Sequence, residues 1–177
     1  SCAPSATGSV TGDTSVGGLV GTNFGGPVYD SSASGDVTGN SSVGGLVGAN
    51  GFESQSYAGG TIETSTASGT VTVPEGATGQ QIGGLVGQNY QGTITTANAT
   101  GDVNAGDATS VGGLVGYTNA TGTSDVINRS YATGNVTGAD QVGGLVGLVT
   151  ETTVNQTYAI GDVAGNTEVG GLVGNAT

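Results

Sequence analysis

The chain has 177 residues, which suits one domain, and it contains 38 glycines but no tryptophan and no methionine. Its apolar residues are nearly all Val, Leu, Ile and Ala, so the composition excludes a thick aromatic core and favours a thin core of stacked small side chains, as in a solenoid. Thirteen acidic residues and one basic residue, Arg129, give a net charge of −12 and exclude the Lys/Arg surface that nucleic acid or anionic lipid requires.

A repeating unit of three elements accounts for most of the chain. The first element is a single Val or Ile, the second is Ala-x-Gly-x-Val beginning five residues later, and the third is Gly-Gly-Leu-Val-Gly preceded by Val or Ile. Six of the seven leucines lie in these pentapeptides, so the pattern is not a chance one. In chain order, the expected segments are 6–10 and 16–21; Val28, 33–37 and 43–48; Ile62, 67–71 and 82–87; Ile94, 99–103 and 111–116; Ile127, 132–136 and 142–147; and Val154, 159–163 and 169–174.

The spacing of the units varies. Successive pentapeptides begin 27, 39, 29, 31 and 27 residues apart. The longest interval carries an additional partial copy of the Ala-x-Gly element at 58–62 and a longer turn at Pro74-Glu75-Gly76. Insertions that fall between elements are what the surface loops of a solenoid tolerate.

Each element is short, β-branched and bounded by Gly, Asn, Asp, Ser or Thr, which is typical of strands and turns. We therefore predict an all-β fold, a β-solenoid (β-helix) of about six coils that forms one domain over residues 1–177. Each coil is expected to have about three short strands, with equivalent strands of successive coils paired in parallel. Strict alternation would place Val16 and Leu19 on opposite sides of a strand. Either both sides are covered or a glycine bend redirects the chain, and we favour the bend.

The repeated Val/Ile-Gly-Gly-Leu-Val-Gly resembles the GLUG motif, which occurs in tandem in secreted and cell-surface proteins of bacteria and archaea, including adhesin-like proteins. The resemblance covers residues 6–174. It implies an extracellular repeat scaffold at the cell surface, with no catalytic or cofactor-binding residues, because the motif carries none. The residues to which the repeat assigns a structural role are Gly17, Gly18, Leu19 and Val20; Gly44, Gly45, Leu46 and Val47; Gly83, Gly84, Leu85 and Val86; Gly112, Gly113, Leu114 and Val115; Gly143, Gly144, Leu145 and Val146; and Gly170, Gly171, Leu172 and Val173.

Stacked coils would align equivalent positions into columns. The column before the Val of Ala-x-Gly-x-Val reads Ser9, Asp36, Thr70, Asp102, Asn135 and Asp162. It is either a ladder of oxygen ligands for structural Ca²⁺ or a solvated polar edge, and we favour the edge because Asn135 separates two acids. A second column holds Asn23, Asn50 and Asn89, whose amides are expected to bond along the stack.

Tyr131 and Tyr158 directly precede the Ala of their units, and they form either a stripe that stacks on sugars or a packing contact between coils, which we favour. Seven Asn-x-Ser/Thr sequons favour a secreted chain that carries glycans. Asn119, in a longer turn, is expected to be the most accessible acceptor, and Asn135 to be crowded by its column. The candidate acceptors are Asn40, Asn98, Asn119, Asn128, Asn135, Asn155 and Asn175.

Catalysis is not expected. The chain has no His and no Lys for nucleophile–base chemistry or for a zinc site, and no acid pair stands out from the repeat. We therefore predict no enzyme, and no cofactor apart from the open option of structural Ca²⁺. The function predicted is that of an extracellular structural or adhesive module; the alternatives are a subunit of a head-to-tail filament and a carbohydrate-binding solenoid.

The ends of the chain bear on its partners. Neither end shows a recognisable cap, so we expect either flanking repeats of a longer chain or copies of the chain to stack on the ends. No segment resembles a signal peptide or a transmembrane span, so no membrane insertion is expected. Cys2, the single cysteine, is open to an intermolecular bridge or a lipid anchor, and we favour a residue left at a processed terminus.

Overall fold

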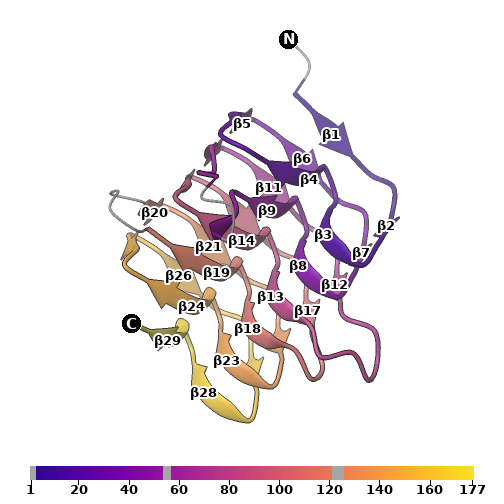
Figure 1. Ribbon diagram of the computed structural model, residues 1–177, viewed down its shortest axis with the longest axis vertical. Helices are drawn as coiled ribbons and strands as arrows, with labels where there is room; N and C mark the ends of the chain where they lie inside the picture. Colours follow the sequence, from indigo (N-terminus) through magenta and orange to yellow (C-terminus); the bar gives the residue numbers. More distant parts are fainter. Residues whose placement is uncertain (1–2, 54–56, 121–125) are drawn as a thin grey trace.

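A computed structural model describes residues 3–53, 57–120 and 126–177. These residues form a β-solenoid in which all pairs of strands are parallel. Figure 1 shows the coils following one another along the molecule in sequence order, from β1 near the N-terminus to β29 at the C-terminus. The predicted fold class is therefore confirmed; Cys2 lies outside the described residues.

Five parallel sheets form the wall of the solenoid. Sheet 1 contains β5 (Val28–Tyr29), β10 (Thr61–Glu63), β15 (Thr93–Thr95), β20 (Val126–Asn128) and β25 (Thr153–Asn155). Sheet 2 contains β1 (Ser5–Ala6), β6 (Ser32–Ala33), β11 (Thr66–Ala67), β16 (Asn98–Ala99), β21 (Tyr131–Ala132) and β26 (Tyr158–Ala159). Sheet 3 contains β2 (Val10–Thr11), β7 (Val37–Thr38), β12 (Val71–Thr72), β17 (Val103–Asn104), β22 (Val136–Thr137) and β27 (Val163–Ala164).

The other two sheets hold the pentapeptides. Sheet 4 contains β3 (Thr14–Gly17), β8 (Ser41–Gly44), β13 (Gln80–Gly83), β18 (Thr109–Gly112), β23 (Asp140–Gly143) and β28 (Thr167–Gly170). Sheet 5 contains β4 (Val20–Asn23), β9 (Val47–Asn50), β14 (Val86–Tyr90), β19 (Val115–Asn119), β24 (Val146–Thr150) and β29 (Val173–Ala176).

One coil passes through the sheets in the order 1 to 5. Within the described ranges, β5–β9, β10–β14, β15–β19, β20–β24 and β25–β29 are complete coils, and β1–β4 form a first coil that has no strand in sheet 1. The expectation of three strands per coil was wrong. The Gly of Ala-x-Gly-x-Val separates a strand of sheet 2 from one of sheet 3, and the bend after the first Gly of each pentapeptide separates sheets 4 and 5.

The core consists of two apolar clusters. Leu46, Ile62 and Ala67 belong to the larger cluster, which sheets 1, 2 and 5 enclose, whereas Val37 and Val43 belong to the smaller one, beside sheets 3 and 4. Val43 and Leu46 come from one copy of the motif, so the glycines between them do redirect the chain. The preferred interpretation of a glycine bend is therefore confirmed.

The second glycine of the pentapeptide lies directly against the next coil. A Cβ atom on Gly45 would stand 2.2 Å from the carbonyl oxygen of Gly84 and 2.9 Å from the Cβ of Ala67. A Cβ atom this close to a carbonyl oxygen would overlap with it, so only glycine fits here. The motif thus encodes the close approach of one winding to the next.

Both insertions lie between elements, as predicted. Residues 74–77 form a turn between sheets 3 and 4, in which the Ala77 N–H donates to the Pro74 carbonyl oxygen at 3.1 Å. Residues 51–53 and 57–59, which we call the side loop, connect β9 to the strand β10. A longer unit therefore leaves the register of its neighbours intact.

Two long columns of residues adopt the left-handed backbone conformation without being glycine, and Gln91 and Glu151 adopt it at a third position. One column directly precedes the Val or Ile of each pentapeptide: Ser15, Ser42, Gln81, Ser110, Gln141 and Glu168, with φ between 50° and 62°. The other turns the chain from sheet 1 to sheet 2: Asp30, Thr64, Thr96, Arg129 and Gln156, with φ between 48° and 51°. Such a conformation is most costly for a β-branched residue, so the fold stores strain at Thr64 and Thr96.

Relief of this strain is expected to stabilise the chain. Asn tolerates the left-handed region better than Thr, so Thr64→Asn and Thr96→Asn should each raise the free energy of unfolding by about 0.5–1 kcal/mol. Urea denaturation measures the change. Thr100→Asn, at an exposed position without a positive φ, is the matched control and should give no gain. A stabilisation of equal size at all three positions would contradict this account.

Candidate functional site

The residues of the pentapeptide lie in the wall and core of the solenoid. Leu46, Leu85, Leu114 and Leu145 are completely buried, whereas Leu19 and Leu172, in the first and last coils, are partly exposed. Leu114 and Leu145 also continue the hydrogen-bonded stack, because the N–H of each Leu donates to the carbonyl oxygen of the Leu in the next coil. These residues therefore build the scaffold and do not line a site.

The predicted asparagine ladder is present. Asn23 Nδ2 donates to Asn50 Oδ1 at 2.8 Å, and Asn50 Nδ2 donates to Asn89 Oδ1 at 2.8 Å. Beyond Asn89 the bonding passes to Thr118, whose Oγ1 accepts from Asn89 Nδ2 at 3.2 Å and lies 3.1 Å from Thr152 Oγ1, to which it is hydrogen-bonded. Each Asn also bonds the backbone at its turn, as the Asn50 amide does with the N–H and the carbonyl oxygen of Gly60. All these side chains are buried, so the ladder is structural.

The column of Asp36, Asp102 and Asn135 bonds from coil to coil. Asp36 Oδ1 accepts from the Thr70 N–H at 2.9 Å, and Asp102 Oδ1 accepts from the Asn135 N–H at 2.8 Å. Asn135 Oδ1 in turn accepts from the Asp162 N–H at 2.9 Å. These contacts support the polar-edge interpretation. In the described part of the chain, no group of three or more His, Cys, Asp or Glu side chains gathers to hold a metal, and structural Ca²⁺ remains the alternative that we do not favour.

The paired tyrosines pack on each other. The rings of Tyr131 and Tyr158 are stacked, with centroids 5.0 Å apart and planes inclined by 2°. The favoured interpretation, packing between coils, is confirmed for this pair.

The sequons differ in their accessibility. Asn119 is only 3% exposed, and its Nδ2 donates to Glu53 Oε1 at 3.0 Å and to the Tyr117 hydroxyl at 2.9 Å. Asn135 and Asn155 are exposed, while Asn40, Asn98, Asn128 and Asn175 are half-buried. The expectation that Asn119 is the most accessible acceptor and that Asn135 is crowded is therefore wrong for the folded chain. Glycosylation itself remains a prediction.

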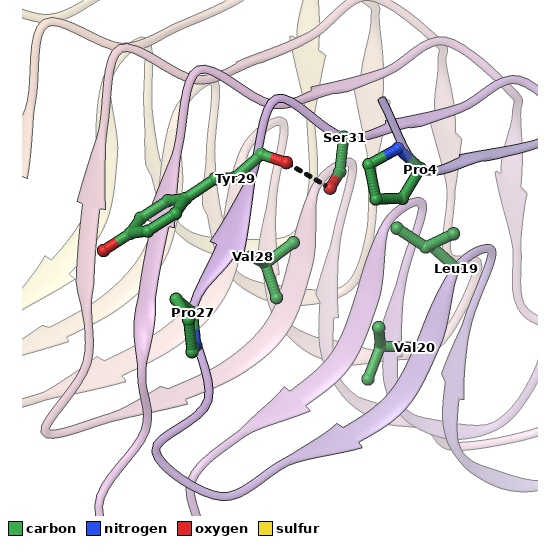
Figure 2. Close-up of a pocket in the computed structure, with 7 residues that line it drawn as sticks. All are labelled: Pro4, Leu19, Val20, Pro27, Val28, Tyr29 and Ser31. Carbon is green, nitrogen blue, oxygen red and sulfur yellow. Dashed lines mark hydrogen bonds between the residues drawn. The ribbon is translucent and has the colours of Figure 1, made fainter. Parts of the chain in front are cut away.

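An apolar hollow of about 450 Å³ opens at the N-terminal end of the solenoid. Figure 2 shows Leu19, Val20 and Val28 converging on it, with Pro4 and Pro27 at its rim. Sheet 1 begins at β5, so Val28 has no strand on its outer side among the described residues. In the following coils Ile62 and Ile94 occupy the equivalent place, stacked on Val28 in register. The hollow thus lies at the place that, one coil further along, Val28 occupies beside Ile62.

A second hollow, of about 430 Å³, lies on the side of the solenoid. We call it the side groove; it is lined by Ser42 of β8, Gln81 of β13, Gln88 of β14, and Phe52 and Glu53 of the side loop. The repeat pattern gave no sign of this groove, because two of its residues belong to the insertion. The only signal in the sequence is that Phe52 and Glu53 interrupt the repeat.

Glu53 fixes the side loop to sheet 5. Its Oε2 accepts from the Tyr117 hydroxyl at 2.9 Å, and its Oε1 accepts from Asn119 Nδ2. Burial raises the pKa of the Tyr117 phenol above its ordinary value, and the hydrogen bond and charge of Glu53 raise it further, against the opposing effect of the Asn119 donation. The phenol is therefore held in its neutral, donating form.

This contact predicts a loss of stability at alkaline pH. Because the pKa of Tyr117 is raised on folding, its contribution is complete below the unfolded pKa of about 10 and is lost as pH rises through the folded value. The difference in unfolding free energy between wild type and Tyr117→Phe, measured in urea, should therefore be constant up to about pH 10 and shrink as the pH rises further. Tyr158→Phe serves as the control, and a difference for Tyr117→Phe that stays constant with pH would contradict the assignment.

No helix of the described residues is long and apolar enough to cross a membrane.

Comparison with known proteins identifies the repeat. The family model described as the GLUG motif matches residues 12–38, 39–72 and 78–104. The chain is similar to halomucin of Haloquadratum walsbyi, at 41% identity over 103 residues, which is 55% of this chain and 1% of halomucin. It is also similar to a putative Gly-rich membrane protein of Evansella cellulosilytica, at 42% identity over 83 residues, which is 47% of this chain and 9% of that protein. The chain thus spans a small part of either relative, and no solved structure matches it.

Proposed function

This chain belongs to the GLUG-motif repeat proteins, and we propose that it is an extracellular structural module of a longer cell-surface protein, without catalytic activity. The names of two relatives, a halomucin and a putative Gly-rich membrane protein, support a place at the cell surface. The small share of each relative that the chain covers supports a module within a longer chain.

The observation that carries this proposal is the use of the motif in packing between coils. Gly45 and Gly84 bring neighbouring windings together, Leu46 and Leu85 fill the core, and Asn50 links three coils. These glycines and leucines are buried, which supports a structural and not a chemical role for the motif. A repeat whose recurring residues all serve stacking builds an extended surface. Other functions then arise in the loops between the strands.

Both ends of the solenoid offer surfaces for further coils. The last coil exposes Val169 and Leu172, whose counterparts Val142 and Leu145 are buried, and the N-terminal end exposes the hollow above Val28. Unpaired strand edges and exposed core residues favour addition of another coil. We propose that flanking repeats of the longer protein cover both ends. The second candidate, a head-to-tail filament of separate copies, rests on the same two surfaces.

A substitution at Gly171 tests whether a flanking repeat covers the last coil. A Cβ atom on Gly171 meets nothing within 4 Å, although the equivalent atom on Gly144 would stand 2.2 Å from the Gly171 carbonyl oxygen. If a flanking repeat stacks here, Gly171→Ala should destabilise this segment in the full-length protein. Hydrogen exchange of the segment, read by mass spectrometry, measures the effect.

The outcomes separate the candidates. If Gly171→Ala leaves the hydrogen exchange of this segment unchanged in the full-length protein, the flanking-repeat proposal is overturned. Sedimentation of the separate chain tests the filament: association that disappears in Leu172→Lys supports it, and a monomer at all concentrations removes it.

The surface location is tested by an antibody against this segment, which should label intact cells; labelling only after permeabilisation would contradict it.

A further inference from the structure

We propose that the side groove and the aromatic side chains beside it bind a neutral glycan. This inference deepens the proposed surface role by naming a ligand class, but it rests on different residues. Its failure would leave the scaffold role unaffected, because none of the glycan-contacting side chains belongs to the pentapeptides.

The groove adjoins an exposed aromatic cluster. Phe24 is 55% exposed and Tyr57 is 53% exposed, and their rings meet edge to face with centroids 5.1 Å apart. The ring of Phe52, which lines the groove, lies 5.9 Å from that of Phe24. The aromatic surface therefore continues into the groove wall.

Two of the three rings of this cluster, Phe52 and Tyr57, belong to the side loop and not to a terminal coil. The other large apolar side chains that are strongly exposed in the described ranges lie at the two ends: Tyr29 beside the N-terminal hollow, and Tyr158, Ile160, Val169 and Leu172 in the last coil. Phe24 follows β4 in the first coil, but its ring packs against Phe52 and Tyr57 of the side loop, which the repeat pattern does not include. Exposed aromatic side chains in this position indicate a ligand surface.

The aromatic cluster is held in place before any ligand arrives. Phe52 and Tyr57 exchange backbone hydrogen bonds of 2.7 and 3.0 Å, which close the side loop. The Gly51 N–H donates to the Asn23 carbonyl oxygen at 2.9 Å, and Glu53 is bonded to Tyr117. Because these bonds hold Phe52, Glu53 and Tyr57 in place, binding does not need to order them.

The polar groups of the groove suit hydroxyl groups. Ser42 Oγ donates to Gln81 Oε1 at 2.9 Å, which orients the Gln81 amide and turns its Nε2 donors away from Ser42. Gln88 supplies a second amide, and Glu53 supplies acceptor oxygens. A sugar ring presents C–H faces that match aromatic rings and hydroxyl edges that match amides and carboxylates.

The charge of the chain decides between neutral and acidic glycans. The net charge is −12, the groove contains Glu53, and the one basic residue, Arg129, lies at the turn after β20, bonded to Gln156. An acidic polysaccharide would be repelled and would find no cation to pair with. The groove therefore selects uncharged sugars.

Isothermal titration calorimetry of the whole chain tests the proposal, with cellohexaose, laminarihexaose and mannohexaose as neutral probes and a galacturonic acid hexamer as the acidic one. We expect saturable binding of a neutral hexamer and none of the acidic one. Phe24→Ala and Tyr57→Ala should each weaken binding by about two- to tenfold, the range of one lost aromatic contact. Tyr158→Ala, which removes an equally exposed tyrosine in the last coil, should leave the affinity unchanged.

A further variant keeps the test independent of loop stability. Gln81→Ser places in this column the residue that the neighbouring coils carry as Ser42 and Ser110, so the fold should tolerate it while the amide is lost. It should also weaken binding. Failure of all three neutral probes at millimolar concentration, equal binding of the acidic hexamer, or full affinity in Phe24→Ala and Gln81→Ser would each overturn the proposal. Self-association that Phe24→Ala abolishes would overturn it as well, since the cluster would then be a contact between copies.

Discussion

Gly84→Ala is expected to unfold most of the chain or to cost at least about 4 kcal/mol of stability. A Cβ atom on Gly84 would stand 2.1 Å from the carbonyl oxygen of Gly113 and 3.0 Å from the Cβ of Ala99. Both neighbours belong to the wall of the next winding, so no flexible side chain can move aside. Thermal unfolding followed by circular dichroism measures the loss.

The same substitution at Gly171 is the matched control. Gly171 occupies the equivalent place in the last pentapeptide, and a Cβ atom there meets nothing within 4 Å. In the separate chain, Gly171→Ala should therefore change stability by no more than about 0.5 kcal/mol, as is usual for surface positions. Equal losses at Gly84 and Gly171 would show that the glycine requirement arises within a coil and not from the contact between coils.

Asn50→Ala is expected to cost about 3–4 kcal/mol, since it leaves several buried groups without a partner. The Asn50 amide bonds Asn23, Asn89 and both backbone groups of Gly60, with distances between 2.8 and 3.0 Å. Removing it interrupts the ladder at its centre and releases the start of the strand β10. Urea denaturation gives the change in unfolding free energy.

Asn104→Ala serves as the control for the ladder. Asn104 is also an asparagine in a strand, but it is exposed on β17. Its loss should stay within about 0.5 kcal/mol. A cost below about 1 kcal/mol for Asn50→Ala would mean that water or neighbouring side chains replace the ladder, and its structural role would have to be abandoned.

The repeat pattern contains enough information to predict the fold class and the in-register columns. Val16, Val43 and Ile82 recur before each pentapeptide because they stack on one another, and a stack of identical positions is visible in one sequence. The number of strands per coil was not predictable in the same way. A glycine marks a bend in Ala33-x-Gly35-x-Val37, but the spacing does not show that the bend divides the element between two sheets.

Other features lack a sequence signal for physical reasons. Ser42, Gln81 and Glu168 hold the left-handed conformation that usually marks Gly or Asn, so their strain is not visible in residue type. The burial of Asn119 depends on Glu53, which is 66 residues away and lies in an insertion. Contacts of this kind arise only once the coils are stacked, which is why the side groove and the accessibility of the sequons were not predicted.

Distances between spin labels on successive coils test the stacking most directly. Thr11, Asn104, Thr137 and Ala164 are exposed and belong to one column of sheet 3. Asn104, Thr137 and Ala164 lie three, four and five windings beyond Thr11. In a Cys2→Ser background, labels at Thr11 and at each of the other three should give separations that grow by about 4.8 Å per winding, reaching about 24 Å at Ala164. Separations that fail to increase regularly along this series would contradict a solenoid built from in-register coils.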